Sequence, residues 1–362
     1  MKKLFFFKSI VFSLLCVSIM ILCACQGKQK RGNEKINVGV IVPLTGQLAY
    51  TGDFVKEALL MSVDTSKVNL IFEDSKGTTK DGVSATNTAI QKGADVIVSM
   101  TSFIAEAINP ICEQRNITHF AFAFSPALAE KTNVLENFPS STAEANEYIN
   151  YIDSMRVKNV CFMRHIEPDA DWGYNKIIKP ALESKNVDII NEPFQPDNLD
   201  FKNNMLRIKN ANPDLLIVQS YAYHFPNIIN YYKTLSIKTP ILCDLNYIDV
   251  FSFGSDVVKN LEDIPFLGVD FVVSDAYGQY SKSYQKLYNK VPYAYSAYAY
   301  DLGHFFNQLA ENKVPLNKQD IIRFNLEHPT DGICGQFAYS SQGVIETNYC
   351  VLKIHDGEYV KY

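Results

Sequence analysis

Four side chains capable of acid, base or metal-binding chemistry lie close together near the middle of the chain. His165, Glu167, Asp169 and Asp171 follow a short apolar run that is typical of a strand, residues 160–163. A histidine beside carboxylates could act as a general acid and base, or bind a metal ion. A polar run of this kind is also typical of a solvated loop at the mouth of a cleft. We favour the loop, and do not expect catalysis here.

The known motifs of enzymes are absent from the rest of the sequence. There is no glycine-rich nucleotide-binding loop, no HExxH zinc motif, no GxSxG serine motif and no CxxC pair. The cysteine spacing does not suggest a zinc site. Cys334 and Cys350 flank a predicted hairpin turn at residues 340–343 and could face each other across it. We therefore expect no enzyme activity, no catalytic residue, no cofactor and no metal.

The first residues are typical of an exported protein. Three lysines precede an apolar run at residues 10–22, which is too short for a lasting transmembrane helix. The run ends in LCAC, which is similar to a bacterial lipobox whose last residue, Cys25, receives a lipid. An ordinary signal peptide cut nearby is the alternative, but a polar stretch follows at once, as a surface tether should. We expect a lipoprotein signal peptide at residues 1–24, a tether at 25–35, and a lipid-anchored protein of the cell envelope.

The net charge of the chain bears on its partners, and its length bears on the number of lobes. Loss of residues 1–24 removes three lysines and no acidic residue, so the formal net charge moves from −5 to −8. This mild acidity gives no reason to expect nucleic acid or an anionic membrane surface as a partner. About 338 residues remain of the 362, more than one compact core usually holds, so two lobes are expected.

From residue 36 onward, strand-like apolar runs alternate with helix-like segments. This order predicts parallel sheets with helices on both faces. The sequence Ser141-Thr142-Ala143-Glu144 is typical of a capping box that opens a helix toward residue 155. The C-terminal part predicts a hairpin between residues 337–339 and 349–354. The expected strands lie at 36–42, 68–72, 96–98, 118–122, 160–163, 187–190, 215–218 and 241–243, and the expected helices at 54–62, 82–92, 103–114, 174–183, 201–210, 227–234, 280–289 and 296–311.

The fold class predicted from this pattern is α/β, with two doubly wound parallel-sheet lobes and a ligand cleft between them. We expect lobe 1 at residues 36–139 plus approximately 275–329, and lobe 2 at 140–274 plus approximately 330–362. Ligands of open α/β sheets bind beyond the carboxyl ends of the strands. The segments singled out by this rule are 43–46, 99–102, 123–125, 167–173, 219–223 and 244–246.

At these segments the sequence resembles the leucine/isoleucine/valine-binding protein family of type I periplasmic binding proteins. The opening INVGVIVPLTGQLAYTG, residues 36–52, looks like the family's first strand and its Leu-Thr-Gly loop. Asp171-Trp172-Gly173 looks like its Asp-Tyr-Gly element, and residues 298–301 match a Tyr-Asp helix motif. The resemblance implies two lobes joined by three crossings that close on a small molecule, and delivery of that molecule to the permease of an ABC transporter.

The resemblance also implies a set of ligand-binding residues. Ser102 precedes the helix expected at 103–114, where it could cap the helix or help its free N–H groups bind an anion, the role of the family's carboxylate-binding serine. Ala123 would offer backbone groups, and Ser125 stands one place beyond the family's second hydroxyl, whose position holds Phe124. Trp172, the only tryptophan, stands at the family's ligand-stacking aromatic residue, although it could instead pack at a lobe surface. Tyr221 aligns with a tyrosine of the cleft.

The position of the family's ammonium-binding acid is the main departure. Our alignment places Leu245 there, with Asp244 one residue away, so a shift of register would make Asp244 the acceptor. A buried ammonium group needs a paired carboxylate. We therefore expect the site to disfavour zwitterions and to accept an apolar or aromatic acid, unless Asp244 takes the role.

Two other functions remain open at this point. A ligand-sensing or surface receptor could use the same fold, and an enzyme could use a related two-lobed scaffold. Neighbouring permease and ATPase genes would favour an importer, whereas loss of turnover on Asp171→Asn would favour an enzyme.

Overall fold

The computed structural model describes residues 35–46, 48–166 and 168–362. The predicted signal peptide, Cys25 and the tether up to residue 34 lie outside the described residues. Within the described part of the chain, no helix is long and apolar enough to cross a membrane.

Five parallel strands form the first sheet, in the order β2-β1-β3-β4-β5. Strand β1, between β2 and β3, has the sequence INVGVIV and is buried on both faces, because a parallel strand covered by helices on each side needs apolar residues. The five strands are β1 (Ile36–Val42), β2 (Val68–Asp74), β3 (Val96–Met100), β4 (Thr118–Phe122) and β5 (Val134–Glu136).

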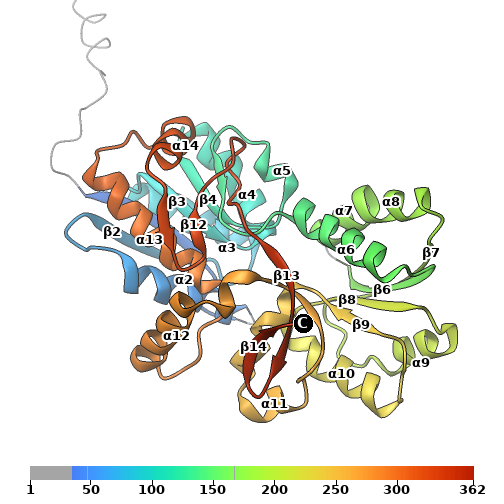
Figure 1. The fold of residues 1–362 in the computed structure, drawn as a ribbon. Coiled ribbons are helices and arrows are strands. Elements are labelled where there is room, and N and C mark those ends of the chain that lie inside the picture. Colours follow the sequence, from blue (N-terminus) through green and yellow to red (C-terminus); the bar gives the residue numbers. More distant parts are fainter. Residues whose placement is uncertain (1–34, 47, 167) are drawn as a thin grey trace, which may run out of the picture. The chain divides into compact units, whose positions relative to one another are not determined.

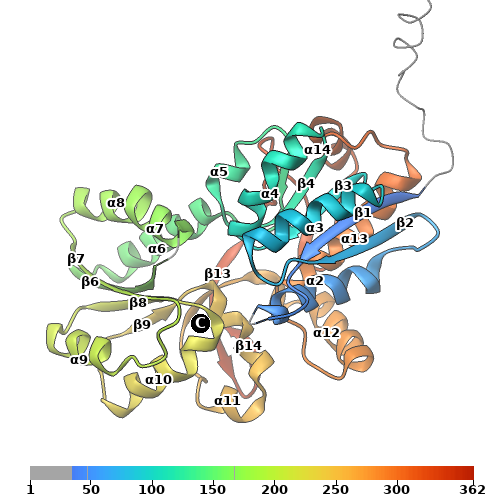
Figure 2. The same cartoon turned by 180° about the vertical axis from the view of Figure 1, so that it is seen from behind.

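A second sheet has seven strands, in the order β14-β13-β10-β9-β8-β6-β7 (Figures 1 and 2). Strands β6 to β10 run parallel, and the last two strands join antiparallel at one edge. The two parallel sheets with flanking helices confirm the predicted α/β class. The strands are β6 (Asn159–His165), β7 (Asp188–Phe194), β8 (Leu215–Gln219), β9 (Ile241–Cys243), β10 (Phe266–Val269), β13 (Tyr349–His355) and β14 (Glu358–Lys361).

Alternation along each central strand distributes its side chains to two helix layers. In β1, Val38 and Val40 lie in the same apolar cluster as Phe54 of the first helix, whereas Ile41 lies with Ile104 of the helix after β3. This period of two is the geometry of a strand. The helices are α2 (Ala49–Ser62), α3 (Thr79–Gln91), α4 (Ser102–Gln114), α5 (Pro126–Ala129), α6 (Ser141–Met155), α7 (Pro168–Gly173), α8 (Lys179–Ser184), α9 (Lys202–Ala211), α10 (Phe225–Thr234), α11 (Ser255–Lys259), α12 (Asp275–Tyr288), α13 (Ser296–Glu311) and α14 (Lys318–Glu327), with a π-helical turn η1 (Tyr174–Ile178) and 3-10 segments η2 (Ala222–His224), η3 (Leu245–Phe253) and η4 (Asp270–Val273).

The strand order creates one switch point in each sheet. In the first sheet the chain moves outward in opposite directions from β1 and β3, and in the second from β6 and β8. Loops diverge at such a point, and the gap between them is where open α/β sheets bind ligands. The residues that follow β3, β6 and β8 are therefore placed to face a common site.

The predicted C-terminal hairpin is wrong in its pairing. Strand β13 pairs with β14 through a turn at Asp356 and Gly357, while β12 (Gly335–Phe337) pairs with β11 (Thr330–Gly332). Both Asp356 and Gly357 have positive φ, which a tight turn requires and which Gly adopts without strain. Cys334 and Cys350 are both free thiols, so the suggested cross-turn disulfide is absent.

We propose two lobes as predicted from the sequence, with one boundary moved. The main chain of Glu136 in β5 pairs with Val344, and Asn325 of α14 binds the main chain of Tyr339. These contacts attach residues 330–345 to elements of lobe 1. The crossing to lobe 2 then falls between Ile345 and β13.

Candidate functional site

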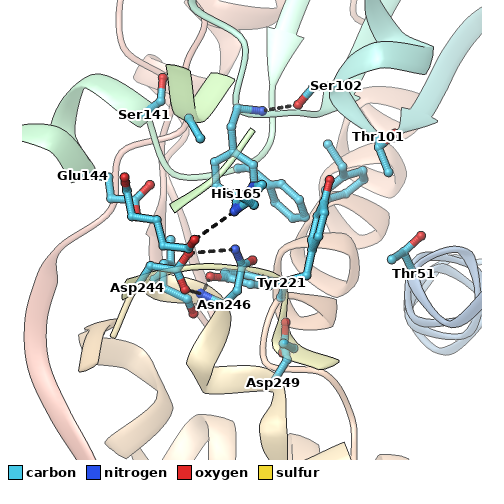
Figure 3. Close-up of a pocket in the computed structure, with 18 of the residues that line it drawn as sticks. Thr51, Thr101, Ser102, Ser141, Glu144, His165, Tyr221, Asp244, Asn246 and Asp249 are labelled. Atoms are coloured by element: carbon cyan, nitrogen blue, oxygen red, sulfur yellow. Dashed lines mark hydrogen bonds between the residues drawn. The ribbon is translucent and has the colours of Figure 1, made fainter. Parts of the chain in front are cut away.

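A cavity of about 190 Å³ lies at the carboxyl ends of the strands of both sheets (Figure 3). Its first wall comes from the start of α2, from the β3–α4 junction and from the segment after β4. Its second wall comes from α6 and from the segments that follow β6, β8 and β9. The residues at both switch points therefore face the same space, as the rule for open sheets predicts. This volume suits a molecule with one ring or a short branched chain.

Two carboxyl groups, Glu144 and Asp244, lie close together on the second wall (Figure 3). Burial raises the pKa of Glu144 to about 7, although its carboxylate accepts a hydrogen bond of 2.8 Å from the hydroxyl of Tyr148. Burial, followed by the charge of Glu144, raises the pKa of Asp244 well above its usual range. Burial without a counter-ion penalises the charged form of each acid, so a cation between them would be bound strongly.

Glu144 was missed by the sequence analysis because its side chain had been assigned to a helix cap. The N-cap of α6 is Ser140, not Ser141, and its hydroxyl accepts from the N–H groups of Thr142 and Ala143. Glu144 is therefore the fourth residue of the helix, and its carboxylate does not reach back to the cap. A one-residue shift of the cap turns the side chain into the cavity.

Asp244 is 3% exposed and accepts three hydrogen bonds. The donors are the N–H of Ser220 at 2.8 Å, and the N–H and side-chain amide of Asn246 at 3.1 and 3.2 Å. These bonds hold the carboxyl group between the ends of β8 and β9. Leu245 lines the cavity as well, so the residues of both registers left open by the sequence do so, and a second carboxyl group, that of Glu144, joins Asp244 there.

Acidic groups dominate the charge of the cavity. Glu106 and Asp249 also line it, and burial raises the pKa of Asp249 to about 8. Among the lining residues that the structure describes there is no lysine or arginine, and the one histidine, His165, has its pKa lowered by burial. The site thus offers several acidic groups, with no lysine or arginine among the described lining residues to balance the charge that they carry when ionised.

The first wall carries the predicted Ser102, at the start of helix α4. Its hydroxyl oxygen accepts the N–H of Phe124 at 3.1 Å, which leaves the hydroxyl proton free to donate (Figure 3). The hydroxyl of the neighbouring Thr101, the N-cap, is buried and has no hydrogen-bond partner in the described structure. Thr101 lies in the segment 99–102 singled out from the sequence, but Ser102 was named there as the possible cap, whereas the N-cap is Thr101.

Two predicted residues of the first wall do not line the cavity. Ala123 is buried, while its neighbours Phe122 and Phe124 do line it. Ser125 is also buried, and its hydroxyl donates to the carboxylate of Glu106. Ser125 therefore positions a lining side chain rather than facing the cavity.

Trp172 is half-buried and does not line the cavity either. The segment after β6 forms helix α7, in which Ala170 and Gly173 do face the cavity. Residues three apart share a helix face, whereas a neighbour lies about 100° round the axis. The sequence had predicted a loop here, and the helical geometry turns the indole ring away.

Tyr221 does line the cavity, as expected, and its ring lies against His165 with the centroids 4.7 Å apart. A further aromatic surface comes from both walls. Its members are Tyr50, Phe54, Phe103, Phe122, Phe124, Phe138, Tyr148 and Tyr295. Such rings suit an apolar body or a cation.

The described side chains of the acid and histidine cluster have different contacts. His165 faces the cavity, whereas Asp171 forms an ion pair with Arg164. Glu167 lies outside the described residues. In the described part of the chain, no three His, Cys, Asp or Glu side chains are grouped so as to hold a metal ion.

Two curated proteins that are similar in sequence to this chain are both named as Leu/Ile/Val-binding proteins or homologs of them. A Leu/Ile/Val-binding protein of Rhizobium johnstonii is 27% identical over 51% of this chain and 54% of its own, and a Leu/Ile/Val-binding protein homolog of Brucella melitensis is 24% identical over 58% and 61%. The alignments thus span little more than half the length of these curated relatives.

Solved structures share the fold at low identity. The leucine-binding protein of Thermotoga maritima has a TM-score of 0.76 and 16% identity, and covers 90% of this chain and 97% of its own. A solute-binding protein of Rhodopseudomonas palustris in complex with benzoate has a TM-score of 0.76 and 13% identity over 91% and 95%. A substrate-binding protein of Streptococcus pneumoniae in complex with isoleucine has a TM-score of 0.73 and 20% identity over 91% and 100%.

The family model described as periplasmic binding protein matches residues 35–358, nearly the whole described part of the chain. With the two parallel sheets and the cavity at their switch points, this match shows that the chain belongs to the periplasmic binding protein family and resembles its leucine/isoleucine/valine-binding, type I members.

Proposed function

We propose that this protein captures a small ammonium-bearing solute outside the cytoplasm and delivers it to an ABC importer. The observation that carries the proposal is the pair of carboxyl groups, Glu144 and Asp244, in an aromatic-walled cavity without a lysine or arginine among its described lining residues. An ammonium group between the two acids would supply the counter-charge that the buried carboxylates lack, and it would offset the repulsion between them.

The opposite wall suits the other end of an amino acid. The first turn of α4 presents backbone N–H groups, and the hydroxyls of Thr101 and Ser102 lie at the same place. A helix N-terminus favours an anion. An amino acid with an aromatic or branched side chain would therefore be held at both ends, with its side chain against the rings.

Calorimetry of the purified protein tests this proposal with matched ligands. We expect leucine or phenylalanine to bind more tightly than 4-methylpentanoic or 3-phenylpropanoic acid, which lack the amino group. Loss of one partner of a buried charge pair costs about 3–5 kcal/mol, or roughly two to four decades of affinity. Tighter binding of the acids would contradict the ammonium site and restore the preference expected from Leu245.

Lipid anchoring at Cys25 is part of the proposal and is supported by the sequence of residues 1–35. A lipid would keep the protein at the membrane beside the permease, its proposed partner. Cys25→Ser should remain an unprocessed precursor without lipid. Metabolic acyl labelling of the wild type and the variant checks this, and equal labelling of both would contradict it.

A further inference from the structure

A buried hydrogen-bond acceptor on the second wall, the side-chain oxygen of Gln219, has no partner in the described structure. On the same wall, His165 uses its Nδ1 atom in a hydrogen bond, which leaves Nε2 as its second ring nitrogen. Gln219 is 8% exposed and His165 is 7% exposed, and both line the cavity. A buried acceptor without a donor is unfavourable, so the Gln219 oxygen points to a hydrogen-bond donor that the cavity receives.

The protonation of His165 follows from its contacts. Its Nδ1 atom lies 3.0 Å from the main-chain oxygen of Gln219. A carbonyl oxygen can only accept, so Nδ1 carries the proton. Burial lowers the pKa of His165, which keeps the ring neutral. Nε2 therefore presents a lone pair, and His165 acts as an acceptor toward the cavity.

The orientation of the Gln219 amide is fixed in a similar way. The hydroxyl of Tyr148 donates to Glu144 and interacts with the side chain of Gln219. Because its proton is used for Glu144, the Tyr148 oxygen accepts from the amide N–H of Gln219. The amide oxygen is then left as the atom without a partner.

Both residues lie at the switch point of the second sheet and line the same cavity. Arg164 of β6 is the register partner of Gln219 of β8, and His165 is the next residue along β6. Neighbouring strands are about 4.8 Å apart. Because both side chains line the same cavity, each can receive a donor from a ligand bound there.

We propose that the ligand carries a second hydrogen-bond donor, an O–H or N–H on its ring or side chain, which binds Gln219 and His165. This proposal rests on the proposed function, since the ammonium group is assigned to Glu144 and Asp244. The ligand class is then a small ammonium compound with a hydroxylated or N–H-bearing aromatic body. Gln219 and His165 are residues that determine specificity for that donor.

The test compares ligands that differ by one hydroxyl group. Affinities of the purified protein are measured by calorimetry for tyrosine and phenylalanine, and for tyramine and phenethylamine. We expect the hydroxylated member of at least one pair to bind about tenfold or more tightly, because a site built for a hydroxyl group rejects the analogue that lacks it. The ligands of the second pair have no carboxylate. The two pairs together therefore test the hydroxyl group both with and without a carboxylate on the ligand.

Matched variants locate the donor's partner. His165→Phe keeps a ring against Tyr221 but removes the acceptor, and Gln219→Leu removes the other acceptor at similar volume. Because the ligand hydroxyl has one proton to donate, the variant that removes its acceptor should bring the affinity ratio of the pair close to one. His165→Gln can still donate to the Gln219 carbonyl and accept from a ligand, and should keep the preference. The ratio is insensitive to a general loss of folded protein.

Each outcome has a distinct meaning. A preference for the hydroxyl that is lost in His165→Phe or in Gln219→Leu, and kept in His165→Gln, supports the proposal. Equal affinities within both pairs in the wild type would overturn it while leaving the ammonium site intact. A preference that survives both variants would also overturn it. If no amine or amino acid of the set binds, the proposed ammonium site fails, and this inference fails with it.

Discussion

Glu144, on helix α6, and Asp244, at the end of β9, bring two carboxyl groups to one side of the same cavity, and the charge of Glu144 adds to burial in raising the pKa of Asp244. The residues are a hundred positions apart in the chain. Their proximity is a product of the second lobe alone, in which α6 and β9 are held by the same sheet.

Replacement of Glu144 by Gln should weaken binding of an ammonium-bearing ligand by about two decades or more, because the amide cannot balance the charge. Glu147→Gln is the matched control, since Glu147 is on the same helix but does not line the cavity. Calorimetry with phenylalanine checks both variants. Equal losses of affinity in the two variants would show that the effect comes from a change in helix α6 and not from a charge in the cavity.

Affinity for the same ligand should rise as the pH rises from about 5.5 to 8. Burial raises the pKa of Glu144 to about 7, so the carboxyl group is protonated below that pH and charged above it. The raised pKa of Asp244 acts in the same direction, and the facing Tyr148, Tyr295 and Tyr349 have pKa values raised by burial and stay neutral.

Titrations at four pH values, with the wild type and Glu144→Gln, measure this dependence. The ammonium group of the ligand stays charged over the range, so the change reports the protein. The variant should show a flatter profile. An affinity that falls with rising pH would be incompatible with an acid pair as the ammonium acceptor.

Gly52→Ala should destabilise the protein by about 1–3 kcal/mol, the usual cost of overpacking. A Cβ atom at Gly52 would lie 1.8 Å from the main-chain oxygen of Pro43, where α2 approaches the end of β1. Gly278→Ala in α12 is the control, because nothing lies within 4 Å of its Cβ position. It should be neutral, or stabilising by up to about 1 kcal/mol. The urea concentrations at the midpoint of unfolding are compared for the two variants. Similar midpoints would contradict the prediction and show that α2 can shift to make room for the added methyl group.

Ligand binding should bring the two proposed lobes together, because the ligand would contact residues of both walls and would stabilise the closed arrangement. Small-angle X-ray scattering of the wild type should give a smaller radius of gyration at saturation with ligand. Glu144→Gln, at the same ligand concentration, should show no change. An unchanged radius in the saturated wild type would indicate a rigid scaffold.

The sequence by itself determined the α/β class and most of the strands, because buried parallel strands need continuous apolar runs such as INVGVIV whatever they contact. It also placed Ser102, Tyr221 and Asp244 at strand ends, and those three residues line the cavity. These features depend on local patterns and on a general rule for open sheets.

The tertiary structure decided which neighbours of those residues face the cavity. Trp172 turns away because residues 168–173 form a helix instead of a loop, and Glu144 turns inward because the cap of α6 is Ser140. A change of one residue in a helix rotates a side chain by about 100°. The unpaired oxygen of Gln219 and the tautomer of His165 depend on hydrogen bonds between separate strands and helices, and such bonds exist only once the second sheet has formed.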